Sequence, residues 1–188
     1  MKTYRIKNTF YYDQGKKDEA LEYLNKALDI QLKKFGKDHH DVAISYNNIG
    51  SVYDDQGKKD KALKYYNKAL DIQLKILGKD HPLVATSYNN IGGVYNDQGK
   101  LNEALKYFNK ALDIELKKLG KGHPQVALSY NNIGSVYKQQ GKYEKAFEYY
   151  NKAFKIFKKR LGTSHFYTTD TLQSMISIKK HLARTKSL

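Results

Sequence analysis

Pairs of adjacent asparagines recur every 42 residues in this chain of 188 residues, each pair inside the hexapeptide SYNNIG. An asparagine amide offers both a hydrogen-bond donor and an acceptor, so it can bind the backbone N–H and C=O of an extended peptide whatever its sequence. Asparagine is also a mediocre helix former, because its side chain competes for backbone hydrogen bonds. The repetition predicts a polar row that contacts a peptide main chain. The pairs are Asn47–Asn48, Asn89–Asn90 and Asn131–Asn132.

Two other interpretations of these asparagines stay open at the level of the sequence. The copies are so alike that a recent duplication would repeat any residue, useful or not. The amides could also bridge adjacent helices or be solvated. Peptide contact is the main hypothesis.

Histidines recur with the same period and raise the question of a metal or catalytic site. Each histidine lies beside the joint between two copies. Because the histidines belong to successive copies, they are too far apart for two of them to share a metal ion. The segment His39–Asp41 is a local cluster of possible ligands, but three adjacent residues on one turn rarely converge on a metal. We therefore predict a structural role at the start of a helix for His39, His81, His123 and His165.

Enzymatic chemistry has little support in the sequence. Serine, histidine and aspartate are present, but no motif places them as nucleophile, base and orienting group. The glycines of the repeated QGK turn end helices and form no phosphate-binding loop. The chain has no cysteine, which excludes disulfides, thiolate nucleophiles and cysteine metal sites. The sequence predicts no catalytic residue, no metal site and no cofactor.

The chain is basic, with a net charge of +15. Residues 129–170 contribute +5 and residues 171–188 contribute +4, so +9 of the charge lies in the last 60 residues. A basic end favours an acidic partner. Nucleic acid is disfavoured, because most tyrosines recur at helical core spacing and exposed stacking candidates such as Tyr65 are few. Nonspecific binding of RNA or an anionic membrane by this end remains an alternative.

The first residues contain no apolar run long enough for a signal peptide. No stretch approaches the roughly 20 apolar residues that a membrane span needs. Hydrophobic residues make up 40% of the chain, which is enough to bury a core. These features predict a cytoplasmic, globular protein.

Internal repetition decides the architecture. The period is 42 residues, and the copies cover residues 3–44, 45–86, 87–128 and 129–170. Each copy predicts two helices, for example roughly Pro82 to Asn96 and roughly Lys61 to Leu77, because apolar residues step by threes and fours. Glycines such as Gly57 close the turns between helices. A single helix pair cannot bury this apolar surface alone, whereas stacked pairs can.

The pattern of large, small and aromatic positions resembles the tetratricopeptide repeat, on Tyr46, Ile49, Gly50, Tyr53, Ala62, Tyr66 and Ala69. The longer unit, the paired asparagines and the LGKDHP joint resemble the kinesin light chain type of this repeat. The resemblance implies an all-α fold, a right-handed α-solenoid of helix-turn-helix repeats with a C-terminal capping helix. It also implies one tetratricopeptide domain over residues 1–188, with the capping helix at about 171–186.

In a tetratricopeptide stack, the free side of each first helix lines a concave groove. At about 100° per residue, Tyr46 and Gly50 lie on the core face, and Asn48 lies opposite them. The kinesin light chain resemblance implies that matching asparagines contact bound peptides. From its charge and its position in the groove, Lys138 is predicted to add charge selection. The predicted groove residues are Asn47, Asn48, Ser51, Asp55, Asn89, Asn90, Asp97, Asn131, Asn132, Ser135 and Lys138.

The ends depart from the pattern. In the first copy, Arg5–Ile6 replace the two asparagines, and this divergent repeat is a candidate for self-association. In the terminal helix, Leu172, Met175 and Ile176 are predicted to cover the last repeat, while basic residues face water. A polar-backed terminal helix is what a solenoid needs for solubility.

The sequence as a whole predicts a non-enzymatic scaffold that binds an extended peptide or a partner helix in its groove. A structural or self-associating array is the first alternative. An anion-binding module led by residues 152–186 is the second alternative. The predicted partner is a protein or peptide rather than nucleic acid.

Overall fold

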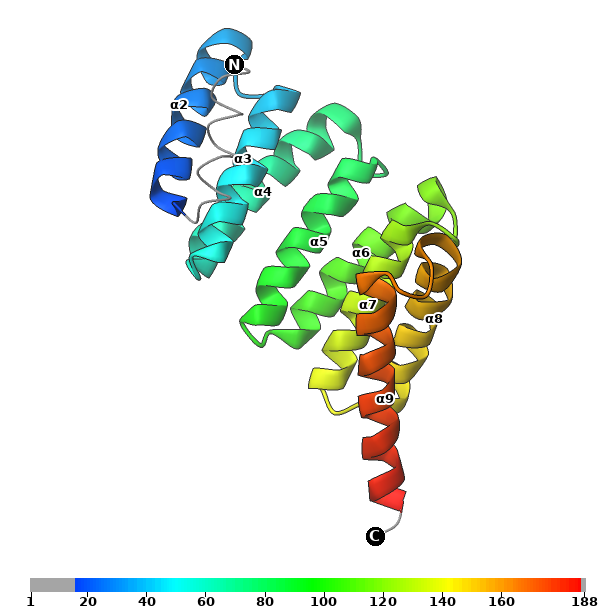
Figure 1. Ribbon diagram of the computed structural model, residues 1–188. Coiled ribbons are helices and arrows are strands. Elements are labelled where there is room, and N and C mark those ends of the chain that lie inside the picture. The colour runs from blue at the N-terminus through cyan, green and yellow to red at the C-terminus, as the bar shows by residue number, and fades with distance from the viewer. Residues whose placement is uncertain (1–15, 187–188) are drawn as a thin grey trace. The chain divides into compact units, whose positions relative to one another are not determined.

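The computed structural model of the chain describes residues 16–186, and within this range every regular element is an α-helix (Figure 1). The helices follow one another as pairs joined by short turns. They are α2 (Lys17–Phe35), α3 (His40–Asp55), α4 (Lys59–Leu77), α5 (Pro82–Asp97), α6 (Leu101–Leu119), α7 (Pro124–Gln139), α8 (Tyr143–Leu161) and α9 (Phe166–Lys186).

The helix pairs predicted from the periodicity agree closely with the structure. Helix α5 ends at Asp97, one residue beyond the predicted end, and α4 begins at Lys59, two residues before the predicted start. Helix α9 begins at Phe166, five residues before the predicted capping helix. The difference arises because the sequence copies start inside the first helix of each pair.

The turn inside each pair depends on a glycine. Gly57 has φ +72°, a left-handed conformation that side-chain-bearing residues rarely adopt. This conformation lets the N–H of Lys58 donate back to the carbonyl oxygen of Tyr53 at 2.9 Å. The turn therefore satisfies a carbonyl that the end of α3 would otherwise leave open.

The histidines at the joints begin helices, as the sequence predicts. The Nδ1 atom of His39 accepts a hydrogen bond from the N–H of Asp41 at 3.2 Å, and His123 accepts from the N–H of Gln125 at 3.1 Å. His81 and His165 make the same contact two residues ahead. A side-chain acceptor at this position satisfies one of the free N–H groups of the first turn.

The chain packs as two compact units, Met1–Val94 and Tyr95–Leu188, whose boundary falls inside α5. The predicted single domain stays a prediction. In the first unit, apolar residues of α2, α3 and α4 form one core: Leu21, Leu24, Leu28, Val42, Ala43, Ile49, Val52 and Ile72. In the second unit, α6 packs on α7 and α8 packs on α9 through separate clusters.

A glycine in the first helix permits close packing against its partner helix. A Cβ atom added at Gly50 would lie 2.8 Å from ring carbons of Tyr66 in α4, and one at Gly134 would lie 3.2 Å from the ring of Tyr150 in α8. Gly50 is a small position of the repeat pattern identified in the sequence. In α9 the equivalent position holds Ile176, whose side chain is exposed.

The terminal helix covers the last repeat with a different face from the predicted one. Met175 is buried as expected, but its partner in the cluster with α8 is Ile178. Leu172 and Ile176 are exposed, so their predicted role is wrong. In α3 and α7, the residues at the equivalent positions face the second helix of the same pair.

A hydrogen bond ties each of the first helices α3, α5 and α7 to the preceding second helix. The hydroxyl of Ser87 donates to Oε1 of Gln73 at 2.7 Å, and that of Ser129 donates to Oε2 of Glu115 at 2.6 Å. Ser45 and Gln31 form the same contact at 2.6 Å. In α8, Phe157 occupies the position equivalent to the acceptor residues Gln31, Gln73 and Glu115.

Glu115→Ala is expected to lower the free energy of unfolding by about 1–3 kcal/mol, because the buried side chains of Ser129 and Glu115 lose their mutual hydrogen bond. Glu115→Gln keeps an acceptor oxygen and copies Gln31 and Gln73, so its stability should match or exceed that of the wild type. Urea unfolding followed by far-UV circular dichroism compares the three proteins. Equal stability of the alanine and glutamine variants would mean that this hydrogen bond contributes nothing.

Candidate functional site

The first asparagine of a pair joins neighbouring first helices. The Nδ2 group of Asn47 in α3 donates to Oγ of Ser87 in α5 at 3.2 Å, and Ser87 in turn donates to Gln73. In the second unit, Oδ1 of Asn131 in α7 accepts from the hydroxyl of Thr171 in α9 at 3.0 Å. These amides therefore serve the bridging role that the sequence left open as an alternative.

The second asparagine of each pair lies about 100° further around the helix. Asn48 is exposed, and Asn90 and Asn132 are half-buried. Within residues 16–186, the side-chain amides of these three residues form no hydrogen bond with the chain. They therefore present an open donor and an open acceptor at the same position of three successive first helices.

The remaining predicted groove residues vary in their surroundings. Asp55 and Asp97 are exposed, and Asn89 is half-buried. The hydroxyl of Ser51 is a hydrogen-bond partner of the buried Tyr66 phenol. Burial raises the pKa of Tyr66, and the charge of Asp54 raises it further.

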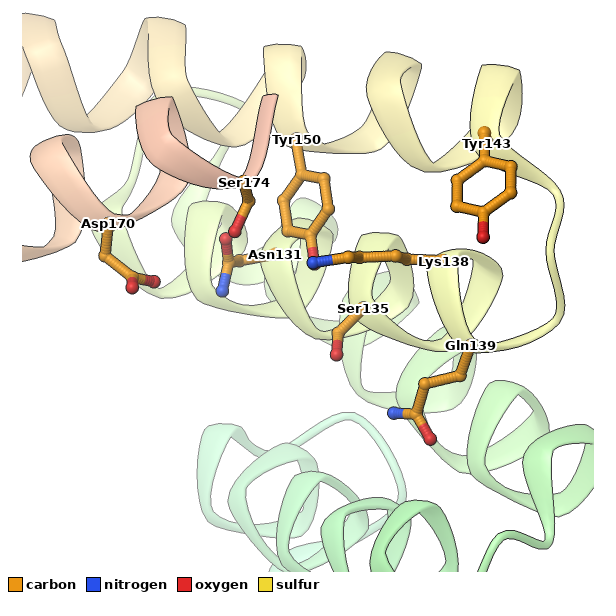
Figure 2. Close-up of a pocket in the computed structure, with 8 residues that line it drawn as sticks. All are labelled: Asn131, Ser135, Lys138, Gln139, Tyr143, Tyr150, Asp170 and Ser174. Carbon is orange, nitrogen blue, oxygen red and sulfur yellow. The ribbon is translucent and has the colours of Figure 1, made fainter. Parts of the chain in front are cut away.

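A pocket of about 440 Å³ lies where α7, α8 and α9 meet (Figure 2). Three of the predicted residues line it, namely Asn131, Ser135 and Lys138, whereas Asn132 does not. Its other lining residues are Gln139, Tyr143, Tyr150, Asp170 and Ser174. All of these side chains carry a polar group, so the pocket is suited to a ligand with many hydrogen-bonding atoms.

The contribution of α8 and α9 to this pocket was not predicted from the sequence. A signal was present in the copies themselves. Ser135 is followed 15 residues later by Tyr150, as Ser51 is by Tyr66, whereas the third copy has Gly93 and Phe108 at these positions. In the second, third and fourth copies the two hydroxyls are thus kept or lost together, which is expected for side chains that touch, whereas the first copy combines Thr9 with Leu24.

The Tyr150 phenol remains protonated at neutral pH. Burial raises its pKa above the usual value of 10.0, and the carboxylate of Asp170 adds to the rise. Hydrogen bonds with the hydroxyls of Ser135 and Ser174 oppose the rise. The phenol therefore serves as a neutral donor inside the pocket.

Tyrosines of the first helices and of their partner second helices pack against one another. Tyr65 is half-buried and stacks on Tyr53 with ring centroids 5.4 Å apart, and Lys68 lies over its ring at 5.4 Å. Tyr149 packs against Tyr137 at the same centroid distance of 5.4 Å, with the two rings tilted by 35°. The prediction that Tyr65 is an exposed stacking candidate is wrong, because the tyrosine side chains cover one another.

The described residues contain no group of three or more His, Cys, Asp or Glu side chains that could hold a metal ion. None of the helices in residues 16–186 combines the length and apolar character of a membrane span. Lysines and an arginine at the end of α8 are exposed: Lys155, Lys158, Lys159 and Arg160.

A family model described as "Tetratricopeptide repeat" matches residues 9–75, 60–114 and 83–159. The chain belongs to the tetratricopeptide repeat family. Its fold class is accordingly the predicted all-α solenoid of helix-turn-helix repeats. No curated protein sequence matches this tetratricopeptide repeat chain.

Solved structures confirm the likeness of fold. BtubC (BKLC) from P. vanneervenii superposes with a TM-score of 0.84 at 22% identity, over 97% of this chain and 72% of that protein. A Podosopora anserina protein designated a kinesin light chain, with nearly identical TPR-like repeats, gives 0.80 at 21% identity over 99% and 88%. The apo form of RapI gives 0.79 at 21% identity over 96% and 48%. The predicted resemblance to kinesin light chain-like repeats is thereby confirmed.

Proposed function

We propose that this tetratricopeptide repeat chain is a non-enzymatic interaction scaffold that binds an extended peptide on the open faces of its first helices. The observation that carries the proposal is the different surroundings of the two asparagines in the first and third pairs, together with the open amide of Asn90. The side chains of Asn47 and Asn131 are engaged by neighbouring helices, whereas the side-chain amides of Asn48, Asn90 and Asn132 form no hydrogen bond within the described range. Open amides at one repeated position suit a peptide backbone, because it repeats its own donor and acceptor.

The family supports this proposal in general terms, since tetratricopeptide repeats commonly serve protein interaction. A protein partner is therefore the expected ligand class, and nucleic acid is not. The alternative of self-association rests on Arg5–Ile6, which lie outside the described residues, so it stays a prediction. The anion-binding alternative rests on the exposed cations of α8, and the cytoplasmic location is likewise a prediction.

The test replaces the three open amides together: Asn48→Ala, Asn90→Ala and Asn132→Ala. Wild type and variant are compared in a quantitative pull-down from native lysate, and captured partners are then titrated as purified proteins. We expect partners to bind the variant about tenfold more weakly or worse, because hydrogen bonds worth about 0.5–1.5 kcal/mol each are lost.

The second helices supply a matched control. Asn25, Asn67 and Asn109 also recur every 42 residues, and each donates to a carbonyl four residues back in its own helix. Their triple alanine variant should keep every partner. The two variants should have similar helicity and melting temperatures. If the first-helix variant keeps all partners at wild-type affinity, the asparagines are not the binding site.

A further inference from the structure

One position near the end of the first helix changes its charge from copy to copy. It is Asp54 in α3, Asn96 in α5 and Lys138 in α7. In the first unit, Oδ1 of Asp54 forms an ion pair with Nζ of Lys59 at 2.7 Å, and each side chain is 25% exposed. The charge of this copy is therefore neutralised within the protein.

The copy in the second unit inverts this arrangement. Lys138 occupies the position equivalent to Asp54, and Tyr143 occupies the position equivalent to Lys59. The acidic side chain is therefore replaced by a basic one, and its counter-ion by a phenol. Lys138 is half-buried, and within residues 16–186 its ammonium group has no ion pair. A partly desolvated cation without a counter-ion favours an anion from outside.

The pocket around Lys138 adds hydrogen-bond donors. Figure 2 shows the Lys138 side chain extended along the pocket toward the Tyr150 phenol, with Tyr143 on one side and Asp170 at the opposite end. The Tyr150 phenol is neutral at pH 7 and lies among hydroxyls. The end near Lys138 therefore suits a carboxylate, while the carboxylate of Asp170 repels a second one.

We propose that this pocket binds a single aspartate or glutamate side chain of the peptide, with its carboxylate on Nζ of Lys138. The inference rests on the proposed function, since it names the residue that the peptide brings to α7. The charge of Asp170 restricts the ligand to an isolated acidic residue, with neutral or basic neighbours on the side of α9. Charge-assisted hydrogen bonds are about twice as strong as neutral ones, so this contact would select among peptides.

The experiment is selection from a bead library of random octapeptides that are acetylated and amidated, so that side chains supply the only carboxylates. Wild type, Lys138→Glu and the matched control Lys155→Glu are used as fluorescent probes. Lys155 is exposed on α8 and is not a lining residue, and its replacement changes the net charge equally. We expect wild type and control to enrich one acidic residue, and Lys138→Glu to enrich a basic residue in its place.

A second measurement uses one peptide selected by the wild type and its Glu→Gln or Asp→Asn version. The wild type should lose about tenfold or more in affinity, and Lys138→Met should bind both versions equally. Circular dichroism melting verifies that Lys138→Met is folded.

Three outcomes would overturn the inference. An acidic preference that persists in Lys138→Glu would place the carboxylate elsewhere. Enriched peptides without any acidic preference, weakened by the first-helix asparagine variant, would overturn the inference and leave the proposed function intact. No enrichment by the wild type would overturn both.

Discussion

Phe157→Ala is expected to lower the free energy of unfolding by about 3–5 kcal/mol. Phe157 in α8 is 1% exposed and packs with Ala127 of α7 and Ala153, and its ring stacks on Tyr167 of α9 with centroids 5.4 Å apart. Alanine would remove this packing and leave a cavity, since small neighbours cannot fill the space. Urea unfolding with hydrogen exchange of α8 and α9 measures the loss.

Phe166→Ala is the matched control for this substitution. Phe166 is 70% exposed at the start of α9, so the same change in side chain should alter stability by no more than about 0.5 kcal/mol. If the two variants unfold at the same urea concentration, the buried ring contributes no more than the exposed one, and the packing described for α8 is wrong.

Gly50→Ala is expected to destabilise the first unit by about 1–3 kcal/mol, although alanine is the better helix former. The added Cβ atom would lie 2.8 Å from ring carbons of Tyr66, which is itself buried, so the ring or the helix must shift. Hydrogen exchange of α3 and α4 reports this unit separately, because the chain packs as two units.

Gly93→Ala should have the opposite sign. Gly93 is also inside a first helix, but a Cβ atom there would have nothing within 4 Å, and its φ is not positive. The substitution should therefore stabilise α5 by roughly 0.5–1 kcal/mol through helix propensity alone. A destabilised Gly93→Ala, or a stabilised Gly50→Ala, would contradict the packing argument.

The fold was predictable because its determinants are local and repeated. Each helix carries its own apolar period, and a glycine such as Gly57 or a histidine such as His39 sets where it ends or starts. Because every copy carries the same signals, a helix end that is poorly marked in one copy is placed by comparison with the other copies. The bounds predicted for α4 and α5 agree with the structure to within two residues for that reason.

The candidate site was predictable only in part, because its residues depend on neighbouring helices. Asn47 and Asn48 are identical in type, and their roles differ because Ser87 of α5 lies beside Asn47, which the sequence of α3 alone does not show. The contribution of Tyr150 and Asp170 to the pocket follows from how α8 and α9 meet, which the period of a single helix does not contain. The same reason explains why Ile178 rather than Ile176 covers α8.

The isoleucine at position 176 determines where such an array can be lengthened. If another second helix were added to pack on α9, its tyrosine equivalent to Tyr66 would need a glycine opposite the ring. Helix α9 has the branched side chain of Ile176 at that position. Engineered copies of the 42-residue unit therefore fit upstream of α9, where Gly50 and Gly134 receive the rings. An extra copy joined after α9 would need Ile176 changed to glycine before its second helix could dock.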